Sequence, residues 1–295
     1  MLNYYDEIKN KLLNNEITKR VKDYSKNKSD LDTYYNVGKL LSETGKYYGE
    51  GIIKQYSKKL IDEIDRKYDI STLKRMRQFY VIIEKGAPME HQLSWSHYKI
   101  LLPLKNVDII TYYINQIIER NLSKRQLQDV VKSKEYERLP EKTRLKLINK
   151  EDNKVEDFIK NPIIIRNPNN IEVTKEKVLQ RLILEDIPSF LKELGKGFCF
   201  IENEYKIKIG NTFNYIDILL FNIEFNCYIV VELKVTELRK EYIGQVEVYM
   251  NYIDSNLRKY NQDKTIGIII CKKDNKYVID YCSDKRILSK EYELV

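Results

Sequence analysis

The first half of the chain carries apolar residues at the spacing of helices. They recur every three or four positions in several stretches: Tyr34–Ser42, Ile52–Ile64, Leu73–Ile83, Ile109–Ile118 and Leu127–Val131. This periodicity predicts an all-α helical domain over residues 1–150.

Two of these helices follow one another in the order of a helix-turn-helix. Ile52–Ile64 is followed by a short stretch and then by a helix over Thr72–Ile83, for which Ser71 is the expected N-cap. The second helix presents Lys74, Arg75 and Arg77. Its basic face predicts contact with DNA, as helix-turn-helix proteins make it.

A second short unit has the same character. Ser123 precedes a helical pattern and is its expected cap, and the next two residues are Lys124 and Arg125. We expect these two side chains to contribute to the same DNA-binding function.

The pattern changes after residue 150. Asn161-Pro162 and Asn167-Pro168 follow a charged run and predict a linker or loop-rich entry over 151–170. The domain beyond it, 171–295, mixes helical and strand patterns. Its predicted helices are Thr174–Leu194 and Leu238–Ile253, and its predicted strands are Tyr205–Ile209, Phe213–Phe221, Cys227–Val235, Thr265–Cys271 and Tyr277–Tyr281. This order predicts an α/β core with a mixed sheet.

The charge of the chain differs between the two halves. The formal net charge of the whole chain is +8. Residues 1–150 hold 30 basic and 20 acidic side chains, whereas residues 151–295 hold 22 and 24. A basic module joined to a slightly acidic one suits a polyanion-binding domain attached to an enzyme.

The sequence also excludes several classes of protein. The two histidines, His91 and His97, both lie in the first half, so the second half has no Ser-His-Asp triad and no histidine zinc site. The chain has no apolar run long enough to span a membrane and no secretion signal near Met1. We therefore expect a soluble, cytoplasmic protein without membrane partners.

The residues that point most directly to chemistry lie on two predicted strands. Asp217 stands among apolar residues of the first strand, and Glu232 and Lys234 stand on the next. Strand alternation places Glu232 and Lys234 on one face. Burying an ionised carboxylate in such surroundings costs on the order of several kcal/mol of free energy unless the carboxylate is paired or bound to a metal. The pattern predicts either a divalent-metal site with a cation beside it or a buried salt bridge.

The helix that follows adds two polar side chains. Gln245 and Tyr249 are four residues apart and share one face of the helix over Leu238–Ile253. They either lean over the carboxylates and hold a phosphate, or belong to an ordinary amphipathic helix.

Together these motifs resemble a known family. Asp217, the stretch Val231–Lys234 and the pair Gln245 and Tyr249 resemble the PDDEXK nuclease fold, in the branch with a RecB-like Gln-x-x-x-Tyr helix. With Leu93–His97 in the first half, the chain resembles the YhcG-type nuclease family, which carries an amino-terminal helical domain.

The resemblance implies hydrolysis of phosphodiester bonds in DNA, with a preference for branched or forked structures. It implies that Asp217, Glu232 and the main-chain carbonyl of Leu233 bind Mg²⁺ or Mn²⁺ and that Lys234 orients or deprotonates the attacking water. Gln245 and Tyr249 would position the phosphate.

One feature departs from the family pattern. Many nucleases of this fold add a glutamate from the first core helix, but Gln180 occupies that place here, flanked by Glu176 and Glu185. Two alternatives therefore remain beside a DNA nuclease. One is a catalytically inactive DNA-binding or scaffolding protein of the same fold, and the other is a nuclease that acts on RNA.

Overall fold

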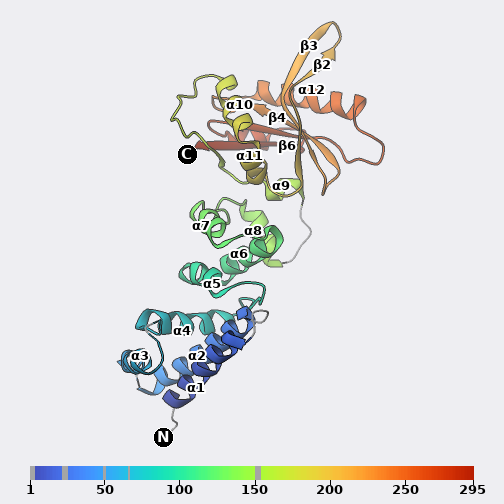
Figure 1. The fold of residues 1–295 in the computed structure, drawn as a ribbon. Helices are drawn as coiled ribbons and strands as arrows, with labels where there is room; N and C mark the ends of the chain where they lie inside the picture. The colour runs from blue at the N-terminus through green and yellow to red at the C-terminus, as the bar shows by residue number, and fades with distance from the viewer. Residues whose placement is uncertain (1–3, 22–25, 49–50, 66, 150–153) are drawn as a thin grey trace. The chain divides into compact units, whose positions relative to one another are not determined.

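The chain divides into two compact units in a computed structural model, Met1–Tyr136 and Glu137–Val295 (Figure 1). The structure describes residues 4–21, 26–48, 51–65, 67–149 and 154–295. The boundary that the sequence predicts at residue 150 lies outside the described residues. Among those residues, no helix combines the length and the apolar character needed to cross a membrane.

The first unit is helical where the structure describes it, as the apolar spacing predicts. Its elements, in chain order, are α1 (Tyr4–Val21), α2 (Lys26–Tyr48), α3 (Gly51–Glu63), α4 (Ile70–Glu84), α5 (Trp95–Leu101), the short 3₁₀ helix η1 (Leu102–Leu104), α6 (Val107–Arg120) and α7 (Lys124–Lys132).

Close packing of α2 against α4 organises this unit. A Cβ atom on Gly38 would lie 2.2 Å from the main-chain oxygen of Met76, so only glycine allows the two helices to approach this closely. Trp95 packs beside them, with its ring centroid 4.8 Å from that of Tyr34 on α2 and 5.5 Å from that of Phe79 on α4. The Leu93–His97 motif therefore contributes a packing residue at this junction.

The sequence predicts the N-cap of α7 correctly but not the N-cap of α4. Ser123 caps α7 as expected and forms a capping box with Gln126. The prediction of Ser71 as the cap of α4 is wrong, because α4 begins two residues earlier than expected and the Asp69 carboxylate accepts the main-chain N–H of Thr72 at 2.7 Å. An aspartate is among the strongest N-cap residues, and it starts the helix ahead of Ser71.

The second unit is built on a six-stranded mixed sheet with the strand order β1-β6-β5-β4-β3-β2. Neighbouring strands from β1 to β4 run parallel, and β4, β3 and β2 form an antiparallel meander. The strands are β1 (Ile163–Ile165), β2 (Phe198–Ile209), β3 (Thr212–Asn222), β4 (Cys227–Leu233), β5 (Ile266–Cys271) and β6 (Ile287–Leu294).

Helices cover the two faces of this sheet and give two hydrophobic clusters. Residues of α10 (Glu176–Glu185) and α11 (Ile187–Leu194) pack on one face with Val231 and Leu233. Residues of α12 (Lys240–Asn256) pack on the other face with Val230. The result is the α/β architecture with a mixed sheet that the sequence predicts, with α12 on the face opposite α10 and α11.

The single helix predicted over Thr174–Leu194 is two helices. They meet at Asp186, which ends α10 and whose side chain caps α11 by accepting the N–H of Ser189 at 3.2 Å. Pro188 follows in the first turn, a position that proline favours. The cap and the proline interrupt an apolar pattern that reads as continuous.

The strand predicted at Tyr277–Tyr281 is also wrong. Most of these residues form the short helix α13 (Lys276–Asp280), in which Tyr277 is largely exposed, as is Tyr281 directly after it, and the sixth strand is β6 instead. β6 has a polar sequence, but its Lys290 is buried and its ammonium donates to the main-chain oxygen of Ile159 at 3.0 Å. A strand with satisfied polar groups does not show the apolar run by which buried strands are recognised.

The described part of the segment expected as a linker or loop-rich entry belongs to the second unit. It contains α9 (Val155–Phe158) and β1, and α8 (Glu141–Asn149) precedes it. The Arg138 guanidinium pairs with Glu193 of α11 and donates to the carbonyl of Pro162 at 2.9 Å. Buried polar contacts of this kind attach the segment to α11 and the sheet.

The close approach at Gly38 gives a test of the first unit. We expect Gly38→Ala to lower its free energy of unfolding by about 1–3 kcal/mol, the usual cost of overpacking, because the rigid main chain at Met76 cannot move aside. Trp95 is the single tryptophan of the chain and lies in this unit, so its fluorescence during denaturation follows the first unit. Gly51→Ala is the control, because a Cβ there meets nothing within 4 Å. Equal unfolding curves for both variants would contradict this packing.

Candidate active site

Asp217, Glu232 and Lys234 come together because β3 and β4 are neighbours in the sheet. The antiparallel ladder between these strands pairs Ile218 with Val231. Asp217 precedes Ile218 and Glu232 follows Val231, so the two carboxylate residues lie next to this pair at the same end of the ladder. Alternation along β4 sends Val231 and Leu233 into the cluster under α10 and α11. It leaves Glu232 on the α12 side, as the sequence predicts.

Lys234 is held between two carboxylates. Its ammonium donates to Glu232 Oε1 at 2.9 Å and lies 3.3 Å from Glu176 Oε1. It also lies 4.9 Å from the centre of the Tyr242 ring. Lys234 and Glu232 are both buried, with 6% and 3% of their surface exposed, whereas Glu176 is half-exposed at the start of α10.

Asp217 is fixed by main-chain groups. Its Oδ2 accepts the N–H of Leu233 at 2.8 Å, which links the carboxylate directly to β4. Its own carbonyl oxygen accepts the side-chain amide of Gln180 at 2.9 Å. Gln180 therefore anchors α10 to β3 at the position of the site, a role that a carboxylate could not play toward a carbonyl oxygen.

The two carboxylates sit in an unfavourable electrostatic environment. Burial raises the pKa of Glu232 to about 7, the charge of Asp217 adds to this rise, and Lys234 opposes it. Burial also raises the pKa of Asp217, against the opposing effects of the Leu233 N–H and Lys234. Burial disfavours the charge on Lys234, but the carboxylates of Glu232, Glu176 and Asp217 outweigh it and raise the pKa of this ammonium. The site holds more negative charge than one ammonium group offsets.

A divalent cation fits this environment. Glu232 Oε2 is buried and has no hydrogen-bond partner among the described residues. A buried carboxylate oxygen without a partner costs free energy that a bound cation would recover. In the described part of the chain no three His, Cys, Asp or Glu side chains converge as a metal-binding group. A cation here would therefore combine two carboxylates with main-chain carbonyl and water ligands, a set that suits Mg²⁺.

The helix α12 places Gln245 and Tyr249 near the carboxylates. The Gln245 amide donates to the Tyr249 hydroxyl at 3.0 Å. Burial raises the pKa of Tyr249, the Gln245 amide opposes the rise, and the charges of Glu232 and Asp217 add to it. The tyrosine is thus within electrostatic range of both carboxylates. The helix approaches β5 closely because Gly267 has no Cβ, which would lie 2.4 Å from Val246.

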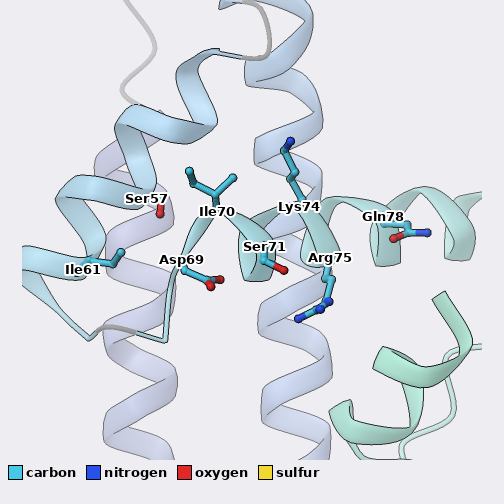
Figure 2. A pocket seen from close by; sticks show the side chains of 8 residues that line it. All are labelled: Ser57, Ile61, Asp69, Ile70, Ser71, Lys74, Arg75 and Gln78. Carbon is cyan, nitrogen blue, oxygen red and sulfur yellow. The ribbon is translucent and has the colours of Figure 1, made fainter. Parts of the chain in front are cut away.

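The basic residues predicted to bind DNA occupy separate places in the first unit. Lys74 and Arg75 are exposed and border an open hollow of about 630 Å³ between α3 and the first turns of α4 (Figure 2). Arg77 is half-buried, with a guanidinium nitrogen 3.4 Å from the place of a Cβ on Gly45 of α2. Lys124 and Arg125 are exposed at the start of α7.

The hollow has a mixed lining. Ser57 and Ile61 reach it from α3, and Asp69 borders it at the start of α4 (Figure 2). The Thr72 N–H lowers the pKa of Asp69, so its carboxylate is charged at neutral pH. Lys74 and Arg75 outnumber this one carboxylate, and the free N–H groups of a helix start add to their attraction for anions.

Three residues contact the site without having been assigned a role from the sequence. Glu176 contacts Lys234 and Gln180 anchors Asp217, although the sequence assigns neither residue a definite role. Tyr242, which the motifs do not include, lies beside the Lys234 ammonium. The spacing of Tyr242, Gln245 and Tyr249 along α12 is three and then four residues, which places them on one helix face. That spacing is the signal that could have identified Tyr242.

Comparison with known proteins gives matches along most of the chain. Residues 156–295 match the family described as the YhcG PDDEXK nuclease domain, and residues 10–138 match the DUF1016 N-terminal domain. A relative from Escherichia coli (strain K12), named "Putative nuclease YhcG", is 22% identical over 309 residues. That alignment covers 89% of this chain and 82% of the relative.

Solved structures show a more distant similarity. A repair endonuclease from Pyrococcus abyssi is 17% identical, with a TM-score of 0.30, and the match covers 41% of this chain. EndoMS in a complex with double-stranded DNA is 19% identical, with a TM-score of 0.29, and the match covers 44% of this chain. In both cases this chain spans about half of the other chain, 48%.

The shared ammonium of Lys234 gives a test of the site as a charged unit. We expect Lys234→Met to lower the free energy of unfolding of the second unit by about 3–5 kcal/mol in metal-free buffer, because it leaves Glu232 buried without its partner. Adding Glu232→Gln should recover most of this loss, since the buried carboxylate that Lys234 contacts most closely is then uncharged. Circular dichroism during thermal unfolding checks both.

The matched control is Lys177→Met, which removes an ammonium 87% exposed and 3.7 Å from Glu204. An exposed pair of this kind contributes little, so its melting curve should be unchanged. Additive losses in the Lys234 and Glu232 double variant would show that the two groups are not coupled.

Proposed function

Because the chain belongs to the YhcG-type PDDEXK nuclease family, we propose that it is a divalent-metal-dependent nuclease that hydrolyses phosphodiester bonds in DNA. The observation that carries this proposal is the buried carboxylate oxygen Glu232 Oε2, which lacks a partner among the described residues beside Asp217 and Lys234. In a structural salt bridge each buried carboxylate oxygen has a hydrogen-bond or ion-pair partner, whereas a metal site without its ion leaves one oxygen free to bind the ion.

Asp217, Glu232 and the main-chain carbonyl of Leu233 would hold Mg²⁺ or Mn²⁺. When bound, a divalent cation supplies a Lewis acid for the phosphate and lowers the pKa of a bound water. The Leu233 N–H fixes Asp217 at 2.8 Å, so one strand supplies both a carboxylate ligand and the group that orients the other.

Lys234 acts beside these ligands as a fixed positive charge. Its contacts with Glu232 and Glu176 keep the ammonium protonated and in place. From there it orients the attacking water and offsets the negative charge that builds on the phosphate during attack. Glu176 argues against the alternative of a catalytically inactive protein. Although position 180 is a glutamine, α10 still brings the Glu176 carboxylate within 3.3 Å of the Lys234 ammonium.

Gln245 and Tyr249 are suited to hold the phosphate. The raised pKa of Tyr249 keeps its hydroxyl protonated, so it remains a hydrogen-bond donor, and the Gln245 amide orients it. Both groups donate to oxygen, and neither adds negative charge to a site that already carries two carboxylates.

A nucleic acid is the class of substrate that the charge of the chain favours. Residues 1–136, which form the helical unit, hold 25 basic and 18 acidic side chains, so this unit attracts a polyanion that the second unit would cut. The groups at the proposed site would contact phosphates and not bases, which suits selection by DNA structure, such as a branch or fork, over selection by sequence. Cleavage of linear duplex, single-stranded, forked and RNA substrates of equal length, with and without Mg²⁺, tests this choice.

Removal of either carboxylate should separate cleavage from binding. We expect Asp217→Ala and Glu232→Ala to abolish Mg²⁺-dependent cleavage and to change DNA affinity by less than about threefold, because phosphate contacts elsewhere dominate affinity. Mn²⁺ should raise the melting temperature of the wild-type chain and not that of either variant. Glu185→Ala is the control, since this exposed residue ends α10. Full cleavage activity in either carboxylate variant would overturn the metal site.

The pair on α12 gives an independent test of the site. We expect Gln245→Ala to raise the activation free energy by about 1–3 kcal/mol, the usual contribution of a hydrogen bond to a charged group. Tyr249→Phe should lower the rate and leave the melting temperature unchanged, because its ring remains packed on the sheet. Single-turnover cleavage rates check both. Unchanged rates in both variants would assign the pair to packing.

The hollow beside α4 gives a test of DNA binding. We expect Lys74→Ala/Arg75→Ala to reduce the slope of log affinity against log salt by about two, because each lost phosphate contact removes about 0.9 from it. Fluorescence anisotropy with a duplex over a salt series measures this slope. Lys99→Ala/Lys132→Ala, which removes two exposed charges from α5 and α7, should leave the slope unchanged. Equal slopes for the two double variants would remove the hollow from the interface.

A further inference from the structure

The antiparallel hairpin of β2 and β3 extends well beyond the region where β3 pairs with β4. The ladder between β3 and β4 runs from Ile218 to Asn222 on β3, whereas the ladder between β2 and β3 continues to Thr212. Figure 1 shows the end of this hairpin reaching past α12. The hairpin is therefore covered on fewer sides than the rest of the sheet.

The two faces of the hairpin end have different characters. Ile207, Ile216 and Tyr205 pack into the cluster under α12. The residues between them face the other way, and the ladder places Lys206 opposite Tyr215 and Lys208 opposite Phe213. We call the set Lys206, Lys208, Phe213 and Tyr215 the hairpin face.

The hairpin face exposes large aromatic rings beside positive charges. Phe213 is 53% exposed and Tyr215 is 51% exposed. The Lys206 ammonium lies 3.9 Å from the centre of the Phe213 ring, a cation–π contact that holds both side chains in place. Single exposed apolar residues are common, but two neighbouring aromatics with two lysines across the strand form a built surface.

This face also leads to the carboxylates. Tyr215 precedes Asp217 by two residues on the same strand, which is about 7 Å along an extended chain. A ligand on the hairpin face therefore lies close to Asp217.

We infer that the hairpin face binds an unpaired nucleotide strand, with bases stacked on Phe213 and Tyr215 and phosphates beside Lys206 and Lys208, and directs it toward Asp217. This inference rests on the proposed nuclease function and specifies its substrate as nucleic acid with an unpaired segment. Aromatic rings stack on bases only when the bases are unpaired, and lysines complement the phosphates of the same strand. The mixture of rings and cations matches a nucleotide strand, which carries both groups in alternation.

The test measures binding of the full-length chain to a fluorescein-labelled 20-nucleotide dT strand in EDTA, where no cleavage occurs. Ionic strength is set high enough to screen phosphate contacts elsewhere, which leaves stacking as the main contribution. We expect Phe213→Ala/Tyr215→Ala to lower affinity for the dT strand by about ten- to a hundredfold, the usual effect of losing two stacking rings. Affinity for a duplex of the same length should change less than about twofold.

Two further variants separate stacking from other causes. Tyr215→Phe keeps the ring and should bind the dT strand like the wild type. Tyr260→Ala removes a tyrosine that is 98% exposed and lies outside the hairpin, and it should have no effect. An rU strand in place of dT distinguishes RNA from DNA as the source of the unpaired nucleotides.

A second readout locates the strand. A dT strand carrying 5-iododeoxyuridine should cross-link under ultraviolet light to Phe213 or Tyr215, as mapped by peptide mass spectrometry. Unchanged dT affinity in the double variant, an equal loss for duplex, or a change in oligomeric state of the variant would overturn the inference. Because these measurements need no metal and no turnover, they stand apart from the carboxylate variants that test cleavage.

Discussion

Two carboxylates close to a single buried ammonium group make the strictest demand on the second unit. Glu232 is buried and Asp217 is partly buried, burial raises the pKa of both carboxyl groups, and Lys234 offsets only part of their charge. Such an arrangement persists only where the surrounding elements hold each group in place. The Leu233 N–H, the Gln180 amide and Glu176 supply those contacts, so β3, β4 and α10 are fixed relative to one another at this point.

The opposite side of the site depends on packing and not on charge. Gly267 on β5 lets α12 approach the sheet, and Val246 and Met250 fill the space that a side chain would have taken. This contact sets the height of the helix face that carries Gln245 and Tyr249. The charged residues of β3 and β4 thus lie near Gln245 and Tyr249 of α12, and hydrophobic contacts with β5 set the position of that helix.

Strand alternation allowed the face of each site residue on β4 to be predicted, because a strand covered on both sides must bury Val231 and Leu233 opposite Glu232. The break at Asp186 and the helix at α13 were not predicted, since local caps and turns override an apolar pattern. β6 was missed because its Lys290 finds its partner, the carbonyl of Ile159, 131 residues away in the sequence. A role such as that of Gln180 likewise depends on a contact that no local pattern contains.

The place of β6 in the sheet bears on how the protein is made. This strand lies between β1 and β5, so it joins residues near 163 to residues near 292 and completes the sheet. During synthesis on the ribosome, the helical unit can fold as soon as it emerges, whereas the sheet stays divided until Leu294 has left the exit tunnel. The sheet that carries the carboxylates is therefore completed only after the whole helical unit has left the ribosome.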